Sequence, residues 1–352
     1  MSDFASLMKE LGNSDAVVVD DGIDGDVTGY IDTGSYSFNA LLSGSIYGGI
    51  ANNRIIALAG DPSTGKSFYA IGIVSQFLID NPEGFVFYFE TENAMTKKNF
   101  VERGCDVGRV ALVPVFTVQE FRTQALKVIN KYLGMPEDER KPMLFVLDSL
   151  GNLSTDKEMK DTADGKDTRD MTRAQLLRAA FRVLTLKLGK AKVPLVFTNH
   201  TYSVQGSYVP TKVQSGGEGG TYAASTIVFL SKSKASEGEG EARIVKGAII
   251  TARLQKSRLT IENKKVKTLL HYSKGLDKYY GLLDLAVKFG VIKKVSTRLE
   301  LPNGEKAFEK TILNNPEKFF TKDVLDLIDE KCKEEFLYGK SNLTGDIEED
   351  DE

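Results

Sequence analysis

Eight consecutive residues after an apolar run could bind a chain of phosphates. The run RIIALA at 54–59 is followed by GDPSTGKS at 60–67, a match to the pattern GxxxxGK[ST]. In this pattern the glycines let the backbone wrap a phosphate, the lysine reaches the β and γ phosphates, and the final hydroxyl ligates Mg²⁺. We therefore expect a loop that binds a nucleoside triphosphate with Mg²⁺, made of Gly60, Asp61, Pro62, Ser63, Thr64, Gly65, Lys66 and Ser67.

Polar side chains also follow other apolar runs. Asp148 ends MLFVLD and is the expected holder of Mg²⁺ through water, which makes Ser67 and Asp148 the metal residues. A carboxylate that activates the attacking water is expected at Glu90 or Glu92, and spacing alone does not choose between them. His200, after PLVFTN, could contact the γ-phosphate and report its loss.

The elements that must position these residues alternate along the chain. Continuous apolar runs indicate strands that are buried on both faces, and helices separate them. We expect an α/β fold with a mostly parallel sheet, strands at 54–59, 85–90, 110–115, 143–148 and 194–199, and helices near 66–80, 118–133 and 170–190. Antiparallel strands at 225–230, 244–254 and 266–272 are expected to extend the sheet.

Both ends of the chain differ from this core. The start predicts a helix from Phe4 to Leu11 and a strand from Ala16 to Val19, suited to docking on a neighbouring subunit or, alternatively, to packing on their own core. The end predicts a helix at 281–290, a hairpin at Asn303-Gly304 and a helical stretch at 316–339. The expected divisions are an arm at 1–30, a core at 31–275, a small C-terminal region at 276–340 and a disordered acidic tail at 341–352.

Composition narrows the class of protein. The net charge of −3 conceals acidic ends, because residues 27–344 alone carry +9, a balance that suits binding of a polyanion. Two distant cysteines and two histidines exclude a disulfide framework and a multi-histidine metal centre. The chain has no apolar run of membrane-spanning length and no secretory signal at its start, so we expect a cytoplasmic protein without a membrane partner.

Two polar stretches, 151–170 and 201–220, are too long to be simple connections. Both are expected to leave the edge of the sheet where a ligand would lie. They supply cations for phosphate contacts and aromatic rings for stacking, namely Lys157, Arg169, Arg173, Tyr202, Tyr208 and Lys212.

Together these residues resemble the RecA recombinases, most closely the UvsX type of tailed bacteriophages. The resemblance spans roughly 30–295. Its motifs, in order, are TGSYSFNALLSG (33–44), GDPSTGKS, FETENAM (89–95), LFVLDSLGNL (144–153), MTRAQ (171–175), FTNHTY (197–202), SGGEGG (215–220), QKSR (255–258) and GLLDLAVKFG (281–290). The order and spacing of DSLGNL, NHTY and KSR are typical of the phage branch.

The resemblance implies roles for single residues. Glu92 corresponds to the family's water-activating glutamate, and His200 to its γ-phosphate sensor. Lys256 and Arg258 match cations that reach the ATP of the neighbouring subunit. The stretches 151–170 and 201–220, the latter with Gly216 and Gly217, match the two DNA-binding loops, and 1–30 resembles the polymerisation arm. Relatives place a tyrosine against the adenine where this chain has Asn99, which leaves the adjacent Phe100 as the expected base contact.

The resemblance also implies an activity. It is that of a DNA-dependent ATPase that forms filaments on single-stranded DNA and catalyses pairing and strand exchange with duplex DNA, using ATP and Mg²⁺. Single-strand-binding and mediator proteins are further expected partners. The alternatives are a ring helicase or translocase on the same core and a non-catalytic recombination mediator.

Overall fold

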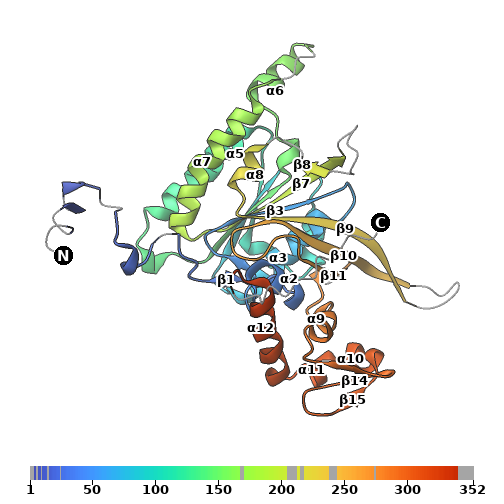
Figure 1. The fold of residues 1–352 in the computed structure, drawn as a ribbon. Helices are drawn as coiled ribbons and strands as arrows, with labels where there is room; N and C mark the ends of the chain where they lie inside the picture. The colour runs from blue at the N-terminus through green and yellow to red at the C-terminus, as the bar shows by residue number, and fades with distance from the viewer. Residues whose placement is uncertain are drawn as a thin grey trace.

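A ten-stranded sheet forms the centre of the molecule (Figure 1). The computed structural model describes the chain except residues 1–3, 5–6, 9, 14–15, 24, 167–169, 204–211, 215–217, 238–243, 273–274 and 340–352. The parallel part has the order β3-β7-β6-β4-β5, with β3 (Ile55–Gly60), β7 (Leu195–Ser203), β6 (Met143–Asp148), β4 (Phe85–Glu90) and β5 (Val110–Pro114). This part confirms the expected parallel sheet.

Further strands extend the sheet on the other side of β3. β9 (Thr226–Glu237) runs parallel to β3. Beyond β9 follow three antiparallel strands, β10 (Ile244–Ser257), β11 (Lys265–His271) and β12 (Gly275–Leu276). A short strand, β8 (Lys212–Gln214), pairs antiparallel with β7. The expected antiparallel extension is therefore confirmed.

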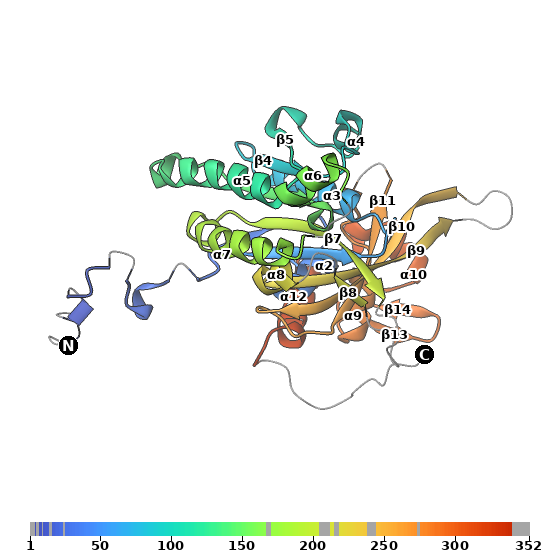
Figure 2. The same ribbon diagram turned by 90° about the horizontal axis from the view of Figure 1, so that it is seen from above.

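Helices cover both faces of the sheet (Figure 2). One face carries α2 (Tyr36–Ser43) and α3 (Lys66–Asp80), whose apolar side chains belong to one buried cluster. The other face carries α5 (Val118–Leu133), α7 (Arg173–Ala191) and α8 (Glu218–Ala223), over a second cluster. Two separate cores on opposite faces explain why the central strands are apolar without alternation.

The stretch 151–170 is not the plain loop expected from its polarity. It contains the 3-10 turn η4 (Leu150–Asn152) and the helix α6 (Asp156–Ala163), which stands beyond the N-terminal end of α7 in Figure 1. The helix begins with a capping box in which the Thr155 hydroxyl accepts from the Glu158 N–H and the Glu158 carboxylate accepts from the Thr155 N–H. The T-x-x-E spacing of Thr155 and Glu158 is a sequence signature of the start of a helix.

The expected strand at 16–19 is also wrong for the single chain. Its residues 16–18 have no regular structure, and Val19–Asp21 forms the 3-10 turn η1. The described residues between 4 and 10 are helical, as expected, and this end stands away from the body in Figure 1. A strand is stable only beside a partner strand, and here none is paired with 16–19. The first paired strand is β1 (Tyr30–Ile31), with β2 (Ile50–Ala51).

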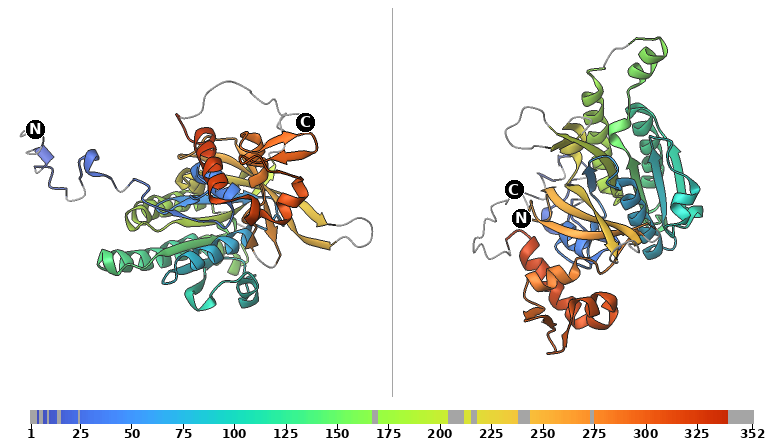
Figure 3. Two further views of the ribbon diagram at one scale, coloured as in Figure 1. Left: turned by 90° about the horizontal axis from the view of Figure 1, so that it is seen from below. Right: turned by 90° about the vertical axis from the view of Figure 1, so that its right-hand side faces the viewer.

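The C-terminal elements gather on one side of the core (Figures 1 and 3). In chain order they are α9 (Leu282–Lys288), β13 (Lys293–Val295), β14 (Arg298–Glu300), β15 (Lys306–Ala307), α10 (Glu309–Asn314), α11 (Pro316–Phe319) and α12 (Lys322–Phe336). The Asn303-Gly304 hairpin is confirmed, since it joins β14 to β15.

The single helix expected at 316–339 is broken in two. Phe320 leaves the helical conformation, and its ring stacks on Tyr279 in the core. Thr321 then precedes α12 without a side-chain capping bond, and the buried Asp329 of that helix accepts hydrogen bonds from Ser45 and Ile46 of the core. The expected tail at 341–352 lies outside the described residues. Among the described helices, none has the length and apolarity needed to cross a bilayer.

Candidate nucleotide and nucleic-acid site

The loop 60–67 joins the end of β3 to the start of α3. Gly65, just before the helix, has φ +91°, a conformation that favours glycine. A Cβ on Gly60 would lie 2.6 Å from the carbonyl oxygen of Leu230 on β9, so the loop passes too close to the sheet for any side chain there. The two glycines therefore permit the backbone path that exposes N–H groups to a phosphate.

Lys66 lies inside this loop and is 6% exposed. Its Nζ donates to the carbonyl oxygens of Gly60 and Asp61, each at 2.9 Å. Burial lowers the pKa of Lys66, and the carboxylates of Asp148, Glu92 and Asp61 oppose that shift. The ammonium is thus held at the mouth of the loop, where phosphate oxygens are stronger acceptors than carbonyls.

The register of the parallel strands brings the other predicted residues to the same edge. Gly60 on β3 is the partner of His200 on β7, and Glu90 on β4 is the partner of Asp148 on β6. Gly60, Glu90 and Asp148 end their strands, and His200 is the last residue of β7 that is paired with β3. The structure therefore places these residues at one edge of the sheet.

Asp148 is buried, and hydroxyls from both neighbouring strands orient its carboxylate. Tyr88 on β4 donates to Oδ2 at 2.6 Å, and Thr198 on β7 donates to Oδ1 at 2.5 Å. Burial, together with the negative charge of Asp148, raises the pKa of Tyr88 well above its ordinary value, so this phenol remains a donor. Each carboxylate oxygen keeps a further lone pair, which suits a residue that holds Mg²⁺ through water.

The structure gives different surroundings to the two glutamates that spacing alone left equivalent. Glu90 is buried, and its carboxylate accepts from the backbone N–H groups of Glu92, Asn93 and Ala94. The side chain of Glu92 is 40% exposed and lies at the mouth of the loop. Glu90 therefore shapes the turn after β4, and Glu92 is the carboxylate that a water molecule can reach.

His200 lies between Lys66 and Glu92. Its Nδ1 is 3.4 Å from Lys66 Nζ, and its Nε2 is 3.7 Å from Glu92 Oε1. Since an ammonium only donates, Nδ1 is the acceptor and Nε2 carries the proton that faces Glu92. A single imidazole thus links the P-loop lysine to the exposed glutamate.

Sequence reasoning missed two further contacts of Glu92. Asn152 Nδ2 donates to Glu92 Oε1 at 2.5 Å, and Ser149 Oγ donates to the same oxygen at 3.2 Å. Both residues belong to the motif DSLGNL, which carries the family resemblance but had suggested no role for Ser149 or Asn152. The polar residues after Asp148 were the available signal.

The expected base contact at Phe100 needs correction. Phe100 is 4% exposed, and its ring packs edge-on against Tyr88 with the centroids 5.3 Å apart. It belongs to the core beneath Asp148 rather than to an open face. The Asn99 side chain is also engaged within its own chain, because it accepts a hydrogen bond from the Thr96 N–H and completes the capping box of α4 (Lys97–Val101).

The residues expected to contact DNA are divided between two segments. Lys157 is exposed on α6, and Tyr202 is 56% exposed at the end of β7. Lys212 begins β8, opposite Ser203 of β7. Arg173 is half-buried at the start of α7. Four of the predicted residues lie outside the described part of the chain, namely Arg169, Tyr208, Gly216 and Gly217.

Lys256 and Arg258 lie on β10 and just after it, beside α8. Lys256 Nζ donates to the carbonyl oxygens of Thr221 and Tyr222 at 2.8 and 3.4 Å. Arg258 lines a cavity of about 530 Å³ together with residues of α7 and α8, including Arg178, Arg182 and Tyr222. Among the described contacts, no hydrogen bond or ion pair joins either cation to the P-loop of its own chain.

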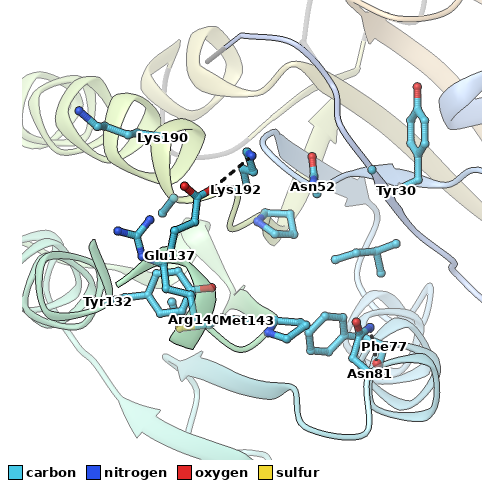
Figure 4. A pocket seen from close by; sticks show the side chains of 15 residues that line it. Tyr30, Asn52, Phe77, Asn81, Tyr132, Glu137, Arg140, Met143, Lys190 and Lys192 are labelled. Atoms are coloured by element: carbon cyan, nitrogen blue, oxygen red, sulfur yellow. Dashed lines mark hydrogen bonds and ion pairs between the residues drawn. The ribbon is translucent and has the colours of Figure 1, made fainter. Parts of the chain in front are cut away.

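A second cavity, of about 310 Å³, lies at the opposite edge of the sheet (Figure 4). Tyr132, Asn52 and Lys190 line it, and its Lys192 is 3.7 Å from Glu137. Met143, the first residue of β6, also lines it, which places it at the amino ends of the strands. Its described lining includes none of the residues predicted for chemistry.

The fold and this site define a P-loop nucleotide-binding protein with a mostly parallel sheet. Residues 2–277 match the family model described as the RecA N-terminal domain. The chain belongs to the RecA family, and the resemblance seen in its motifs is confirmed.

Three relatives illustrate the match. The recombination and repair protein of Enterobacteria phage T4 is 31% identical over 256 residues, which cover 73% of this chain and 63% of that protein. Protein RecA of Mycoplasmopsis pulmonis is 24% identical over 83% of this chain and 81% of its own length. Protein RecA of Treponema pallidum is 27% identical over 82% of this chain and 65% of its own length.

Proposed function

We propose that this RecA-family protein is an ATP-dependent DNA recombinase, which polymerises on single-stranded DNA and exchanges it with a homologous duplex strand. The observation that carries the ATPase step is the arrangement of Lys66, His200 and Glu92 at the mouth of the P-loop. A phosphate-binding cation beside an exposed carboxylate that can orient the attacking water suits triphosphate hydrolysis, and the histidine between them can contact the γ-phosphate.

The described residues fit ATP and Mg²⁺. Lys66 and the N–H groups of 60–67 bind the phosphates, and the Ser67 hydroxyl and Asp148 hold the metal. Bound Mg²⁺ neutralises charge on the β and γ phosphates. Glu92 orients and activates the attacking water, and His200 contacts the γ-phosphate.

Assembly completes the site. Lys256 and Arg258 lie beside α8, where they can face a neighbouring subunit's triphosphate and neutralise the charge that develops during hydrolysis. The N-terminal helix exposes Phe4, Leu7 and Leu11 at helical spacing, an apolar stripe suited to docking. The exposed valines at 17–19 could then add a strand to the sheet of that neighbour, whose β5 is an edge strand.

DNA would lie along the two segments that leave the carboxyl edge of the sheet. Lys157 and Arg173 contact phosphates and Tyr202 stacks on a base, while base pairing supplies the sequence specificity. The finer assignments Arg169, Tyr208, Lys212, Gly216 and Gly217 belong to the same proposal. Single-strand-binding and mediator proteins are its expected partners in the cytoplasm.

The decisive variant is Lys66→Ala, because Lys66 is the cation inside the loop. We expect it to abolish ATP hydrolysis stimulated by single-stranded DNA, measured by phosphate release. Lys127→Ala, an exposed lysine of α5, is the matched control and should keep the wild-type rate. Normal turnover of Lys66→Ala refutes the proposal.

Electron microscopy tests the assembly. With single-stranded DNA and a non-hydrolysable ATP analogue, the wild-type protein should form helical filaments. Closed rings would instead favour a helicase or translocase.

A further inference from the structure

We propose that Asn152 restrains Glu92 until a DNA phosphate binds Arg173, so that this contact makes hydrolysis depend on DNA. The inference rests on the proposed function, because it takes Glu92 as the group that activates water. Its basis is the hydrogen bond of 2.5 Å from Asn152 Nδ2 to Glu92 Oε1. A bond from an amide to a carboxylate is charge-assisted and stronger than a neutral one.

The contact turns the carboxylate of Glu92 toward the residues after β6. Ser149 Oγ also donates to Oε1, at 3.2 Å, so two donors occupy the lone pairs of that one oxygen. Ser149 is buried at the end of β6, whereas Asn152 is exposed. Ser149 is therefore the fixed partner of Glu92, and Asn152 is the partner that can move away.

Asn152 belongs to the turn that opens the segment 151–170, and Arg173 holds that turn in place. The Arg173 guanidinium, from the start of α7, donates to the carbonyl oxygens of Gly151 at 2.7 Å and Leu153 at 2.6 Å. These are the carbonyls on either side of Asn152. The position of Asn152 therefore depends on what Arg173 binds.

A DNA phosphate would compete for Arg173. A guanidinium binds a phosphate more strongly than it binds neutral carbonyls, since the phosphate is charged and can accept two bonds. When Arg173 turns to a phosphate, the carbonyls of Gly151 and Leu153 lose their donor. The turn is then free to move, Asn152 leaves Glu92, and the carboxylate can turn to the attacking water.

The test is the rate of ATP hydrolysis without DNA. We expect Asn152→Ala to raise this rate about ten- to a hundredfold, the effect of losing one hydrogen bond to a charged group, and to reduce the stimulation by single-stranded DNA accordingly. Asn130→Ala, an exposed asparagine of α5, is the matched control and should match the wild type. The double variant Glu92→Gln with Asn152→Ala should have no DNA-free hydrolysis, which assigns the gain to Glu92.

The outcomes separate this inference from the proposed function. If the wild-type protein shows no DNA-stimulated hydrolysis, the proposed function fails. If the wild type is stimulated but Asn152→Ala has an unchanged or lower DNA-free rate, only the restraint is refuted. Binding of fluorescent single-stranded DNA with a non-hydrolysable analogue should be unchanged in Asn152→Ala, since a merely misfolded variant would lose it.

Discussion

The Tyr88 hydroxyl lies 2.6 Å from Oδ2 of Asp148, at the centre of the sheet and beneath the P-loop. Tyr88 is fully buried and bonds to a carboxylate that is itself only slightly exposed. With Thr198 on the other oxygen, it leaves Asp148 a single orientation. The direction in which Asp148 faces the proposed metal site is therefore set by two strands that flank its own.

Removing the Tyr88 hydroxyl should impair hydrolysis, while the phenyl ring continues to fill the core. We expect Tyr88→Phe to lower kcat about ten- to a hundredfold, because a hydrogen bond to a charged group contributes roughly 1.5–3 kcal/mol. Tyr69→Phe is the matched control, since the buried Tyr69 hydroxyl bonds only to the neutral Thr268 among its described contacts, at 3.3 Å. Equal kcat losses in the two variants would argue against a positioning role for Tyr88.

Substitution of Glu92 should change the rate of hydrolysis, whereas substitution of Glu90 should change the stability of the fold. Glu92→Gln should abolish hydrolysis and leave folding intact, because the Glu92 side chain is 40% exposed and its donors Ser149 and Asn152 can bond to the amide oxygen of a glutamine. Glu90→Gln should lower the free energy of unfolding by about 1–3 kcal/mol, since a neutral amide replaces a carboxylate that accepts three backbone N–H groups. Urea unfolding and phosphate release measure the two effects. An active Glu92→Gln variant would remove Glu92 from the mechanism.

Lys256 and Arg258 should act on the neighbour's site. We expect the double variant Lys256→Ala with Arg258→Ala to bind ATP but not to hydrolyse it. Mixed with the inactive Glu92→Gln protein, it should recover part of the rate, because a site between the two proteins can combine Glu92 from one subunit with both cations from the other. Arg253→Ala is the control, as this exposed arginine of β10 contacts Asn263 of its own chain. Failure of the mixture to recover activity would place the cations elsewhere.

Asp170 should make the stability of the fold at the start of α7 depend on pH in the acid range. Hydrogen bonds from the hydroxyls of Thr172 and Thr155, then from the Thr172 N–H, lower the pKa of Asp170 from 3.8 to about 2. A depressed folded-state pKa stabilises the fold above the unfolded value of about 3.9, and that contribution is lost as the pH falls toward 2. The stability gap between wild type and Asp170→Asn should therefore be widest at pH 7 and narrow below roughly pH 4 in chemical unfolding.

A control separates this effect from the loss of one negative charge. Asp138→Asn changes an exposed aspartate of the 3-10 turn η3 (Glu137–Glu139). Its stability gap from the wild type should stay the same over that pH range. A gap for Asp170→Asn that does not narrow in acid would contradict the assignment.

The sequence by itself determined the P-loop, the α/β class and most of the central strands. These features depend on neighbours in the chain, because the GxxxxGK[ST] spacing and runs such as MLFVLD act through local backbone geometry and burial. It also placed Asp148 and His200 at strand ends. It did not predict the helix α6, although the capping residues Thr155 and Glu158 were visible.

Spacing alone did not choose between Glu90 and Glu92, and only the tertiary structure showed that Glu90 is buried, that Phe100 lies in the core and that Asn152 contacts Glu92. The contact of Asn152 with Glu92 depends on residues that are distant in sequence and meet across neighbouring strands, whereas Glu90 bonds to backbone N–H groups only two to four positions along the chain. The Glu92 contact, for example, joins residues 60 positions apart. Local spacing carries no information on such pairs, because the strand order and register that bring them together result from packing of the whole sheet.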